Sequence, residues 1–417
     1  MAPWLGVVAD DYTGATDLAG RIASEGTSVT LWFGAPPYEE IAGELADCAV
    51  IALKSRSIGA AAAVDMSLVA GRALRDAGIE HLYFKYCSTF DSTERGNIGQ
   101  VAEALARETE ARIVPFVPSA PANGRTVYQG HLFVGRELLD ESPLRNHPLN
   151  PMRDSDVARL LSPQASWRVS NITHKSVAQG TEQIAAEIDA LDDRSHVVID
   201  ATSEDDLASI ALATASLPLT TGSAGLAAAL ARTRRGRNTC QVRPAPRPEH
   251  GGTVVISGST SAATRGQVET FERSHPSFEI SPFALARGDS VVEAALAFVA
   301  NALAAGAVPL VYSTVQREEV VRAQQELGIQ VAAELVEGAL ARIASGAREL
   351  GAIRMIIAGG EVSGAVINAL NITRVSVHEE VAPGVPWIAS EGSSSMSLLL
   401  KSGNFGGPDF FAEAVAR

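Results

Sequence analysis

The sequence predicts an α/β protein with two domains, each a mainly parallel sheet flanked by helices. Short runs of β-branched residues alternate with Ala-rich segments of helical length, an order that favours βαβ units. The 417 residues give each domain room to bury a core of its own. A stretch rich in Arg and Pro, 232–252, interrupts the alternation and indicates an extended linker, so we assign residues 1–235 and 250–417 to the two domains.

In the N-terminal domain the β-branched runs are bounded by turn residues. They predict strands at Leu5–Ala9, Val29–Phe33, Ala49–Leu53, His81–Phe84, Ile113–Val117, Val197–Asp200 and Leu217–Thr221. Helices are predicted from the turn after the first strand to near Gly26, and over Ile98–Arg107 and Leu226–Ala231. Residues 121–170 break this rhythm, and we expect a loop-rich insertion there that serves as a lid or a binding surface.

The C-terminal domain opens with the same order of elements. Strands are predicted at Thr253–Ile256, Val308–Tyr312 and Met355–Ala358, with a helix over Ala262–Phe271. The uncharged stretch 294–312 reaches transmembrane length but contains Asn301, Gly306 and Pro309. We therefore predict a buried helix over Ala294–Ala305 and then a strand, in a soluble domain.

Composition excludes several classes of protein. A net charge of −14 argues against nucleic-acid binding through phosphate neutralisation. Aromatic residues make up only 5%, so the cores must consist mainly of Ala, Val, Leu and Ile. Cys48, Cys87 and Cys240 form no C-x-x-C pair, and no cluster has metal-ligand spacing. With no targeting signal visible, we expect a reduced, cytoplasmic protein without a tightly held metal.

Four turns each follow a strand and open a helix: 10–15, 222–225, 257–261 and 359–364. Free N–H groups at helix N-termini attract anions, and glycine lets the backbone approach a phosphate closely. Any one of these turns can equally be an ordinary tight connection. Two of them in the C-terminal domain favour a phosphate site, although neither matches a P-loop or a dinucleotide fingerprint.

Acidic and basic residues mark two further places. Asp10 and Asp11 end a strand and can accept a proton, bind a hydroxyl or hold Mg²⁺ through water, or simply cap a helix. The chain has only four lysines, and three of them (Lys54, Lys85 and Lys401) stand in polar turns, which suggests anion sites.

The loop 85–93 crowds an ammonium group, several hydroxyls and Asp91 into one strand-to-helix connection. This mixture suits a small acid sugar, although a single Asp in a loop is often only a turn residue. Cys87 is interpreted as a packing residue. His131 and His147 lie in the insertion, where a binding role and a surface role are both open.

Taken in order, these motifs resemble the four-carbon acid sugar kinases over nearly the whole chain. The matching segments are Ala9-Asp-Asp-Tyr-Thr-Gly-Ala15, Lys85-Tyr-Cys-Ser-Thr-Phe-Asp-Ser92, Gly96-Asn-Ile-Gly99, Gly222-Ser-Ala-Gly-Leu226, Ser257-Gly-Ser259, Gly359-Gly-Glu361 and Lys401-Ser-Gly-Asn-Phe-Gly406. Residues 123–134 and 145–148 are similar to the 3-oxo-tetronate kinase branch. Tyr12 and Val362 depart from the family pattern, in which Leu and Thr are common at these places.

The resemblance implies an N-terminal acid-sugar-binding domain and a C-terminal nucleotide-binding domain unrelated to the P-loop. It implies ATP-dependent phosphorylation of the 4-hydroxyl of 3-oxo-tetronate (3-dehydrotetronate) in the catabolism of four-carbon acid sugars. Nucleotide contacts would come from Ser257, Gly258, Ser259, Gly359, Gly360, Glu361, Ser363, Gly364 and Gly403. Mg²⁺ would be carried mainly by the ATP phosphates, with help from Glu361.

The acid sugar would be held by Asp10, Asp11, Arg56, Lys85, Ser88, Thr89 and Asp91. Asp10, Asp91 and Lys85 are the implied catalytic residues, and Asp10 and Asp91 are rival candidates for the base. The partner is then a small-molecule acid sugar rather than nucleic acid or membrane. A homodimer is compatible with the sequence, which does not determine the oligomeric state.

Three alternatives stay open at this point. A kinase for threonate or erythronate would differ by a few pocket contacts. A NAD-dependent dehydrogenase would share the architecture, but G-x-G-x-x-G is missing. A sugar-acid sensor would bind the acid without phosphoryl transfer.

Overall fold

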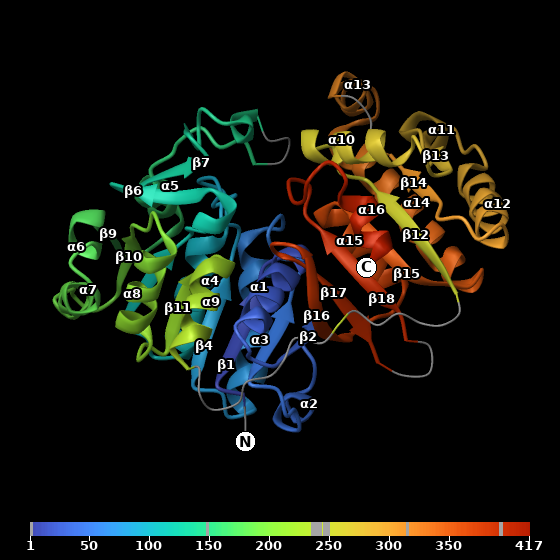
Figure 1. Cartoon of the computed structure of the whole chain (residues 1–417). Coiled ribbons are helices and arrows are strands. Elements are labelled where there is room, and N and C mark those ends of the chain that lie inside the picture. Colours follow the sequence, from blue (N-terminus) through green and yellow to red (C-terminus); the bar gives the residue numbers. More distant parts are fainter. Residues whose placement is uncertain (1–2, 147–149, 235–243, 245–250, 314–316, 392–394) are drawn as a thin grey trace. The chain divides into compact units, whose positions relative to one another are not determined.

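The structure is a computed structural model that describes residues 3–146, 150–234, 244, 251–313, 317–391 and 395–417. The chain divides into two compact units, Met1–Gln241 and Val242–Arg417, each with its own run of paired strands (Figure 1). Most of the predicted linker, Cys240 and His147 lie outside the described residues. The first linker residue, Arg232, belongs instead to the last turn of a helix, where it pairs with Glu25 at 3.0 Å.

Eight strands of the first unit run parallel in the order β2-β3-β1-β4-β11-β5-β10-β9. The strands predicted from sequence are confirmed to within two residues at either end, and β9 was not predicted. Their bounds are β1 Leu5–Ala9, β2 Val29–Phe33, β3 Cys48–Ala52, β4 His81–Lys85, β5 Ile113–Val117, β9 Arg168–Ile172, β10 Ser195–Ile199 and β11 Leu219–Gly222.

The predicted loop-rich insertion contains regular structure that the sequence did not indicate. β6 (Arg125–Tyr128), β7 (His131–Val134) and β8 (Glu137–Leu138) form a small antiparallel sheet. Its two turns place Gly130 and Gly135 at positive φ, a conformation that favours glycine. The remaining described part carries three 3₁₀ turns and the short helix α5 (Val157–Leu161).

Helices cover both faces of the first sheet. The longer ones are α1 (Tyr12–Ser24), α3 (Ala60–Asp76), α4 (Ile98–Glu108), α7 (Thr181–Asp189), α8 (Glu204–Thr214) and α9 (Ala224–Thr233), with short α2 (Tyr38–Ala42) and α6 (His174–Val177). α1 packs on α9, α9 on α8 and α8 on α7, while α3 packs on α4. Crossovers between parallel strands are right-handed, so the connections that run toward β2 and those that run toward β9 lie on opposite faces.

Helix α9 is unusual because Ala224–Ala231 are all buried, in the sequence Ala-Gly-Leu-Ala-Ala-Ala-Leu-Ala. It packs against α1 and α8, and its small side chains let the helices approach closely. A larger side chain at such a position overpacks the interface and typically costs about 1–3 kcal/mol.

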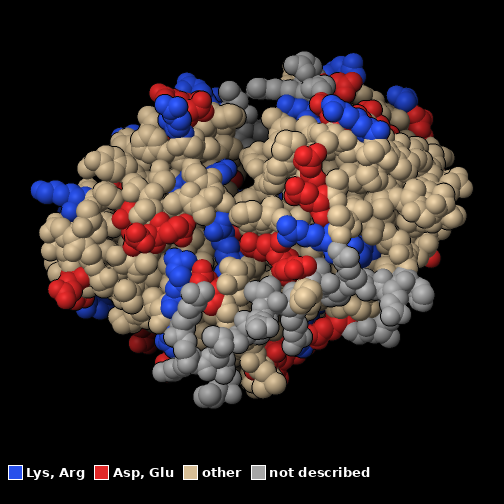
Figure 2. Space-filling model, in the orientation of Figure 1, with Lys and Arg blue, Asp and Glu red and all other residues tan. Residues whose placement is uncertain are grey.

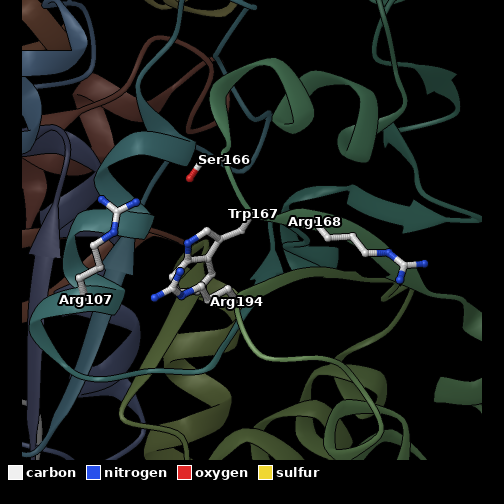
Figure 3. A pocket seen from close by; sticks show the side chains of 5 residues that line it. All are labelled: Arg107, Ser166, Trp167, Arg168 and Arg194. Carbon is white, nitrogen blue, oxygen red and sulfur yellow. The ribbon is translucent and has the colours of Figure 1, made fainter.

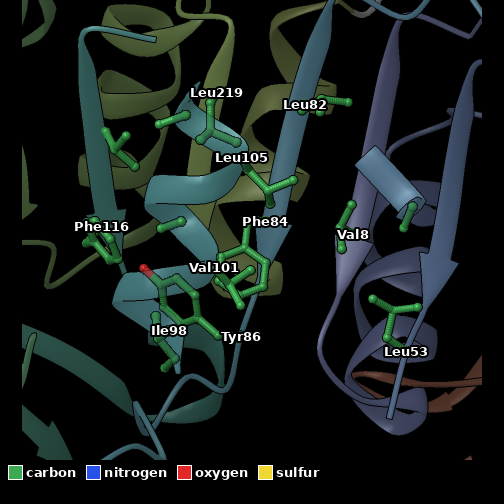
Figure 4. Packing of buried hydrophobic residues seen from close by; sticks show 14 of the residues in the cluster. Val8, Leu53, Leu82, Phe84, Tyr86, Ile98, Val101, Leu105, Phe116 and Leu219 are labelled. Carbon is green, nitrogen blue, oxygen red and sulfur yellow. The ribbon is translucent and has the colours of Figure 1, made fainter. Parts of the chain in front are cut away.

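The core of the first unit lies partly between the sheet and α4 (Figure 4). Most of its members are Ala, Val, Leu and Ile, as the composition predicts. Aromatic rings gather near the end of β4, where Tyr86 stacks on Phe116 at 6.0 Å and meets Phe90 at 5.4 Å. Full burial of one such side chain contributes roughly 1.5–3 kcal/mol. This packing anchors the loop that follows β4.

The second unit has a mixed sheet in the order β13-β14-β12-β15-β18-β17-β16. The first five strands pair in parallel, and β18-β17-β16 are antiparallel. The bounds are β12 Gly252–Ser257, β13 Ser277–Glu279, β14 Leu310–Tyr312, β15 Ala352–Ala358, β16 Arg374–Ala382, β17 Val385–Ser390 and β18 Ser397–Lys401.

The helices of the second unit are α10 (Ala262–Phe271), α11 (Pro282–Ala286), α12 (Val291–Ala304), α13 (Arg317–Leu327), α14 (Ile329–Glu349), α15 (Gly360–Ala369) and α16 (Phe410–Ala416). The uncharged stretch 294–312 is a helix followed by a strand, as predicted. The predicted helix was expected to be buried, but α12 is buried along one face only. Among the described helices, none combines the length and the apolar character that crossing a membrane requires.

Each unit has a point where neighbouring strands send their helices in opposite directions. In the first unit, α1 leads from β1 to β2 and α4 leads from β4 to β5. In the second, α10 leads from β12 to β13, whereas the chain after β15 leads to the antiparallel strands. Ligands of open α/β sheets bind at the carboxyl ends of strands at such points.

Candidate active site

Asp10 lies directly after β1 and is almost fully buried, with 2% of its surface exposed. Its carboxylate accepts two hydrogen bonds from the Arg56 guanidinium, Nε to Oδ2 at 2.9 Å and Nη2 to Oδ1 at 2.7 Å. The backbone N–H groups of Ser55 and Arg56 donate to the Asp10 carbonyl. This double attachment holds the segment after β3 against the end of β1.

Asp11 caps the N-terminus of α1 and also contacts Arg56. Its carboxylate accepts from the Gly14 N–H at 3.1 Å and from the Thr13 hydroxyl at 2.6 Å. A Cβ atom on Gly14 would lie 2.2 Å from Asp11 Oδ1 and 2.8 Å from Lys85 Nζ. Only glycine lets the acidic turn and the lysine approach this closely, which explains the glycine of the motif.

Lys85 is the last residue of β4 and is 3% exposed. Its Nζ donates to the Tyr86 carbonyl at 2.8 Å. Its charge opposes the burial that raises the pKa of Asp10 and of Asp17, and it helps Arg56 to lower the pKa of Asp11. Because β1 and β4 pair in register at Ala9 and Lys85, the acidic turn and the lysine share one edge of the sheet.

The loop after β4 carries the remaining predicted residues. The Thr89 hydroxyl donates to Asp91 Oδ1 at 2.7 Å and lies 2.8 Å from Cys87 Sγ. Burial and the Asp91 charge raise the pKa of Cys87 to about 11, while Arg56 and Lys85 act in the opposite direction. The thiol therefore lies close enough to Arg56 and Lys85 for both of their charges to act on it. Ser88 makes no hydrogen bond within the described part of the chain.

The two neighbouring carboxyls have pKa values pushed in opposite directions. Burial raises the pKa of Asp10 above its usual range despite the opposing charge of Arg56. For Asp11 the effect of burial is outweighed by Arg56 and Lys85, and its pKa is lowered. A pair separated in this way is typical of sites that move protons.

Sequence analysis missed Asp17, which belongs to the same cluster. Burial raises its pKa, and the charges of Arg21, Lys85 and Asp11 act on it. Arg21 binds Asp17 at 3.1 Å and Asn123 Oδ1 at 2.8 Å, which attaches the start of the insertion to α1. The available signal was helical spacing, because Asp17 follows Thr13 by four residues on the same face.

In the second unit three predicted segments meet. The Gly258 N–H donates to the Ala358 carbonyl at 3.0 Å, and the Gly359 N–H donates to the Lys401 carbonyl at 2.9 Å. Gly359 has a φ of 120°, and a Cβ there would lie 3.3 Å from the Ser259 backbone nitrogen. These bonds join the carboxyl ends of β12, β15 and β18.

We call the joined carboxyl ends of β12, β15 and β18, with the turn 402–404, the cradle of the second unit. Gly403 lies in that turn. A Cβ on Gly403 would lie 2.7 Å from Ser259 Oγ and 3.0 Å from Ser261 Oγ, so these serines pack against the turn too closely for any residue but glycine. Its carbonyl accepts from the Ser261 and Thr264 hydroxyls at 2.5 Å and 2.7 Å. Backbone N–H groups at helix N-termini and in glycine turns are the donors that commonly bind phosphates.

The other predicted nucleotide residues lie in and before α15. Gly360 and Glu361 begin the helix, and Gly364 is buried within it. The Ser363 side chain is fully buried, and its hydroxyl has no hydrogen-bond partner among the residues that the structure describes. Ser257, at the end of β12, is also fully buried. The glycine turns that meet at the carboxyl ends of β12, β15 and β18, together with the Ser363 hydroxyl, fit a bound nucleotide.

Comparison with known proteins matches both units. A sugar-binding N-terminal domain matches residues 5–230, and a nucleotide-binding C-terminal domain matches residues 254–411. The 3-oxo-tetronate kinase of Pseudomonas fluorescens is 45% identical over 420 residues, covering 100% of this chain and 97% of the relative. This chain belongs to the four-carbon acid sugar kinase family.

Solved structures agree with this placement. A Salmonella typhimurium protein superposes with a TM-score of 0.83 at 36% identity, with 98% of each chain covered. A Haemophilus influenzae protein gives 0.76 at 36% identity, with 99% of each covered. The chain is thus a carbohydrate kinase, a phosphotransferase built on two α/β units.

One further cavity of the kinase, about 300 Å³, is lined by Arg107, Ser166, Trp167, Arg168 and Arg194 (Figure 3). Arg168 begins β9 and Arg194 precedes β10, so the cavity lies at the amino ends of these strands. It contains none of the predicted site residues. Arg107 is already paired with Glu103 at 2.8 Å.

Charge on the kinase surface is interspersed, with basic and acidic groups alternating over the face shown (Figure 2). Within the described residues, no group of three or more His, Cys, Asp and Glu side chains is arranged to hold a metal ion. The charged side chains that converge in the first unit are those around Asp10, Asp11, Asp17, Arg56 and Lys85.

Proposed function

We propose that this kinase transfers the terminal phosphoryl group of ATP to the 4-hydroxyl of 3-oxo-tetronate. The observation that carries the proposal is the cluster at the ends of β1 and β4, where buried carboxyls and two cations share one edge of the sheet. A small hydroxy acid needs both signs of charge, cations for its carboxylate and acceptors for its hydroxyls. The 3-oxo-tetronate kinase relatives support the choice of acid.

In this proposal residues 1–235 form the acid-sugar-binding domain, and Lys85 and Arg56 bind the substrate carboxylate. Asp11 orients Arg56 and the turn at the start of α1. The hydroxyls of Ser88 and Thr89 bind the oxygens of the sugar. Held in this way, the acceptor hydroxyl is positioned and the charge that develops during transfer is stabilised.

The proton of the 4-hydroxyl passes to a carboxylate as the oxygen bonds to phosphorus. Asp10 has the raised pKa that favours a base, but both of its oxygens bind Arg56. Among the described residues, the Asp91 carboxylate accepts one hydrogen bond, from Thr89 to Oδ1, and none reaches its Oδ2. The two remain rival bases, and replacing each with Asn distinguishes them.

Residues 250–417 form the nucleotide-binding domain in this proposal. Gly258, Ser259, Gly359, Gly360 and Gly403 supply a backbone surface for phosphates, with Ser257, Ser363 and Gly364 supporting it. ATP supplies the phosphoryl group, and its phosphates carry Mg²⁺ with help from Glu361. The proposal is supported by the close approach of the turns at Gly359 and Gly403 to Ser259, and by the buried Ser363 hydroxyl, which has no partner among the described residues.

The test is coupled ADP release with Mg-ATP across four-carbon sugar acids and their 3-oxo forms. Turnover confined to a 3-oxo acid supports the proposal. Turnover on threonate or erythronate instead keeps the kinase and changes the acid. Silence across the panel, with nucleotide binding intact, overturns the choice of acceptor.

A further inference from the structure

Lys401, the last residue of β18, is a lysine with no exposed surface. Its Nζ donates to Thr264 Oγ1 at 2.9 Å and to the carbonyls of Ser402 and Gly403, both at 3.1 Å. All three acceptors are neutral. The ammonium therefore lies directly beneath the turn that forms the cradle of the second unit.

No carboxylate of the described residues forms an ion pair with Lys401 Nζ. The elements packed against it contribute Ala358 of β15, Thr264 of α10 and the Phe410 ring of α16, at 5.8 Å from its centroid. Glu361 in α15 and Asp409 before α16 are acidic residues of neighbouring helices, and within the described residues neither forms an ion pair with Lys401. Burial alone lowers the pKa of Lys401 to about 7.

The position is unfavourable for a cation in a second way. Thr264 belongs to the first turn of α10, the positive end of that helix dipole. A buried charge without a partner costs several kcal/mol, and a positive charge at this end of a helix adds to that cost. An anion bound at the same place removes both penalties.

The peptide geometry shows where such an anion would bind. In a trans peptide the C=O and N–H groups point in opposite directions. Because the carbonyls of Ser402 and Gly403 face Nζ, the N–H groups of Gly403 and Asn404 face away from it. Neither N–H has an acceptor among the described residues. Successive free N–H groups of this kind form an anion-binding nest.

We propose that Lys401 is a positioning residue for the nucleotide phosphates: its ammonium fixes the turn 402–404 so that two N–H groups face the phosphates, and bound phosphate in turn keeps the ammonium protonated. The inference rests on the proposed nucleotide role of the second unit. The inference adds that nucleotide binding is coupled to protonation of Lys401. Near neutral pH, binding then takes up a proton at this residue, which does not touch the nucleotide.

The experiment is calorimetric titration with Mg-ADP at pH 8 in two buffers of different ionisation enthalpy, which counts protons. Burial lowers the pKa of Lys401 to about 7 in the free protein, so at pH 8 we expect the wild-type protein to take up a proton, up to one for each nucleotide bound. Lys401→Met abolishes this uptake and weakens Mg-ADP binding on the order of 10- to 100-fold. Binding of the acid sugar stays unchanged.

Two variants complete the design. Lys175→Gln removes an exposed lysine of α6 and keeps both the proton uptake and the affinity. Lys401→Arg keeps a permanent charge, so it retains more affinity than Lys401→Met but takes up no proton. The wild-type proton count needs no variant and tests the proposal even where a substitution prevents folding.

Nucleotide binding without proton uptake in the wild-type protein, or uptake that persists in Lys401→Met, overturns the role of Lys401 and leaves the kinase proposal intact. Absence of Mg-ADP binding to the wild-type protein overturns both.

Discussion

The two units handle buried charge in opposite ways. In the first, the carboxyls of Asp10, Asp11 and Asp17 are matched by three cations, those of Arg21, Arg56 and Lys85, so charges of both signs balance within the protein. In the second, Lys401 is buried beneath a turn of hydroxyls and peptide groups, and no opposite charge from the described part of the chain pairs with it. A balanced site suits a ligand with both donors and acceptors, and an unbalanced one suits a polyanion.

The largest expected effect tests the balanced site. We expect Asp→Asn at the true base, Asp10 or Asp91, to lower kcat by more than about 10²-fold, because the amide cannot accept the proton. The other variant should mainly raise KM for the acid. Steady-state kinetics on purified, folded variants makes the measurement. Losses below that level in both variants would show that positioning alone drives transfer.

The second prediction uses one glycine of each unit to test which substrate that unit binds. Gly14→Ala should raise KM for the acid on the order of 10-fold or more, because its Cβ would displace Asp11 and Lys85. Gly403→Ala should do the same to KM for ATP, because its Cβ would meet Ser259 and Ser261. Steady-state kinetics with each substrate varied in turn measures the KM for the acid and the KM for ATP.

The matched controls are Gly59→Ala and Gly407→Ala, where a Cβ meets nothing within 4 Å. Both should leave either KM close to wild type. If Gly14→Ala raised the KM for ATP rather than the KM for the acid, the assignment of substrates to the two units would be reversed.

Acid stability should differ between the units. Burial lowers the pKa of His81 and His196 in the first unit to about 4. The unfolded chain binds these protons near pH 6.5, so stability is lost as pH falls from about 6.5 to 4. Each histidine should cost on the order of 2–3 kcal/mol by pH 4. Thermal melts of His196→Phe, which keeps the ring packing on Trp167, should show a smaller decline.

The last prediction concerns Lys401 in the nucleotide-free protein, whose burial affects stability in the same direction as that of the histidines but in a higher pH window. Its folded pKa of about 7 lies below the unfolded value near 10.5, so the unfolded chain binds the extra proton between these limits. Stability should therefore rise with pH above 7, by up to about 1.4 kcal/mol per pH unit. Denaturant melts of wild type and Lys401→Met at several pH values give the difference, which a flat curve would contradict.

Local patterns predicted the parallel strands well. Leu5–Ala9, Val29–Phe33 and Ile113–Val117 have the predicted bounds because each is a β-branched run between turn residues. The small sheet β6-β7-β8 was not predicted, since its strands are short, polar and dependent on turns at Gly130 and Gly135. Helix α3 lacked a start signal, because Gly59 provides no side-chain cap.

The site residues divide in the same way, into those visible as local sequence motifs and those that depend on the fold. The acidic turn, the loop after β4 and the glycine turns were visible as motifs because each is continuous in sequence. Asp17 and the lack of a counter-charge at Lys401 were not visible, because both depend on residues that other strands and helices bring nearby. Sequence shows which groups are present; only the fold shows which charges are balanced.

Helix α9 limits how this kinase can change. Eight consecutive buried positions filled mainly by Ala and Gly leave few neutral substitutions, since larger residues overpack and polar ones lose hydrogen bonds. Sequence drift should therefore collect on exposed helices such as α3, while α9 stays nearly fixed. A mutant library built to accept a new acid should randomise residues 86–92 and leave Ala224–Ala231 untouched.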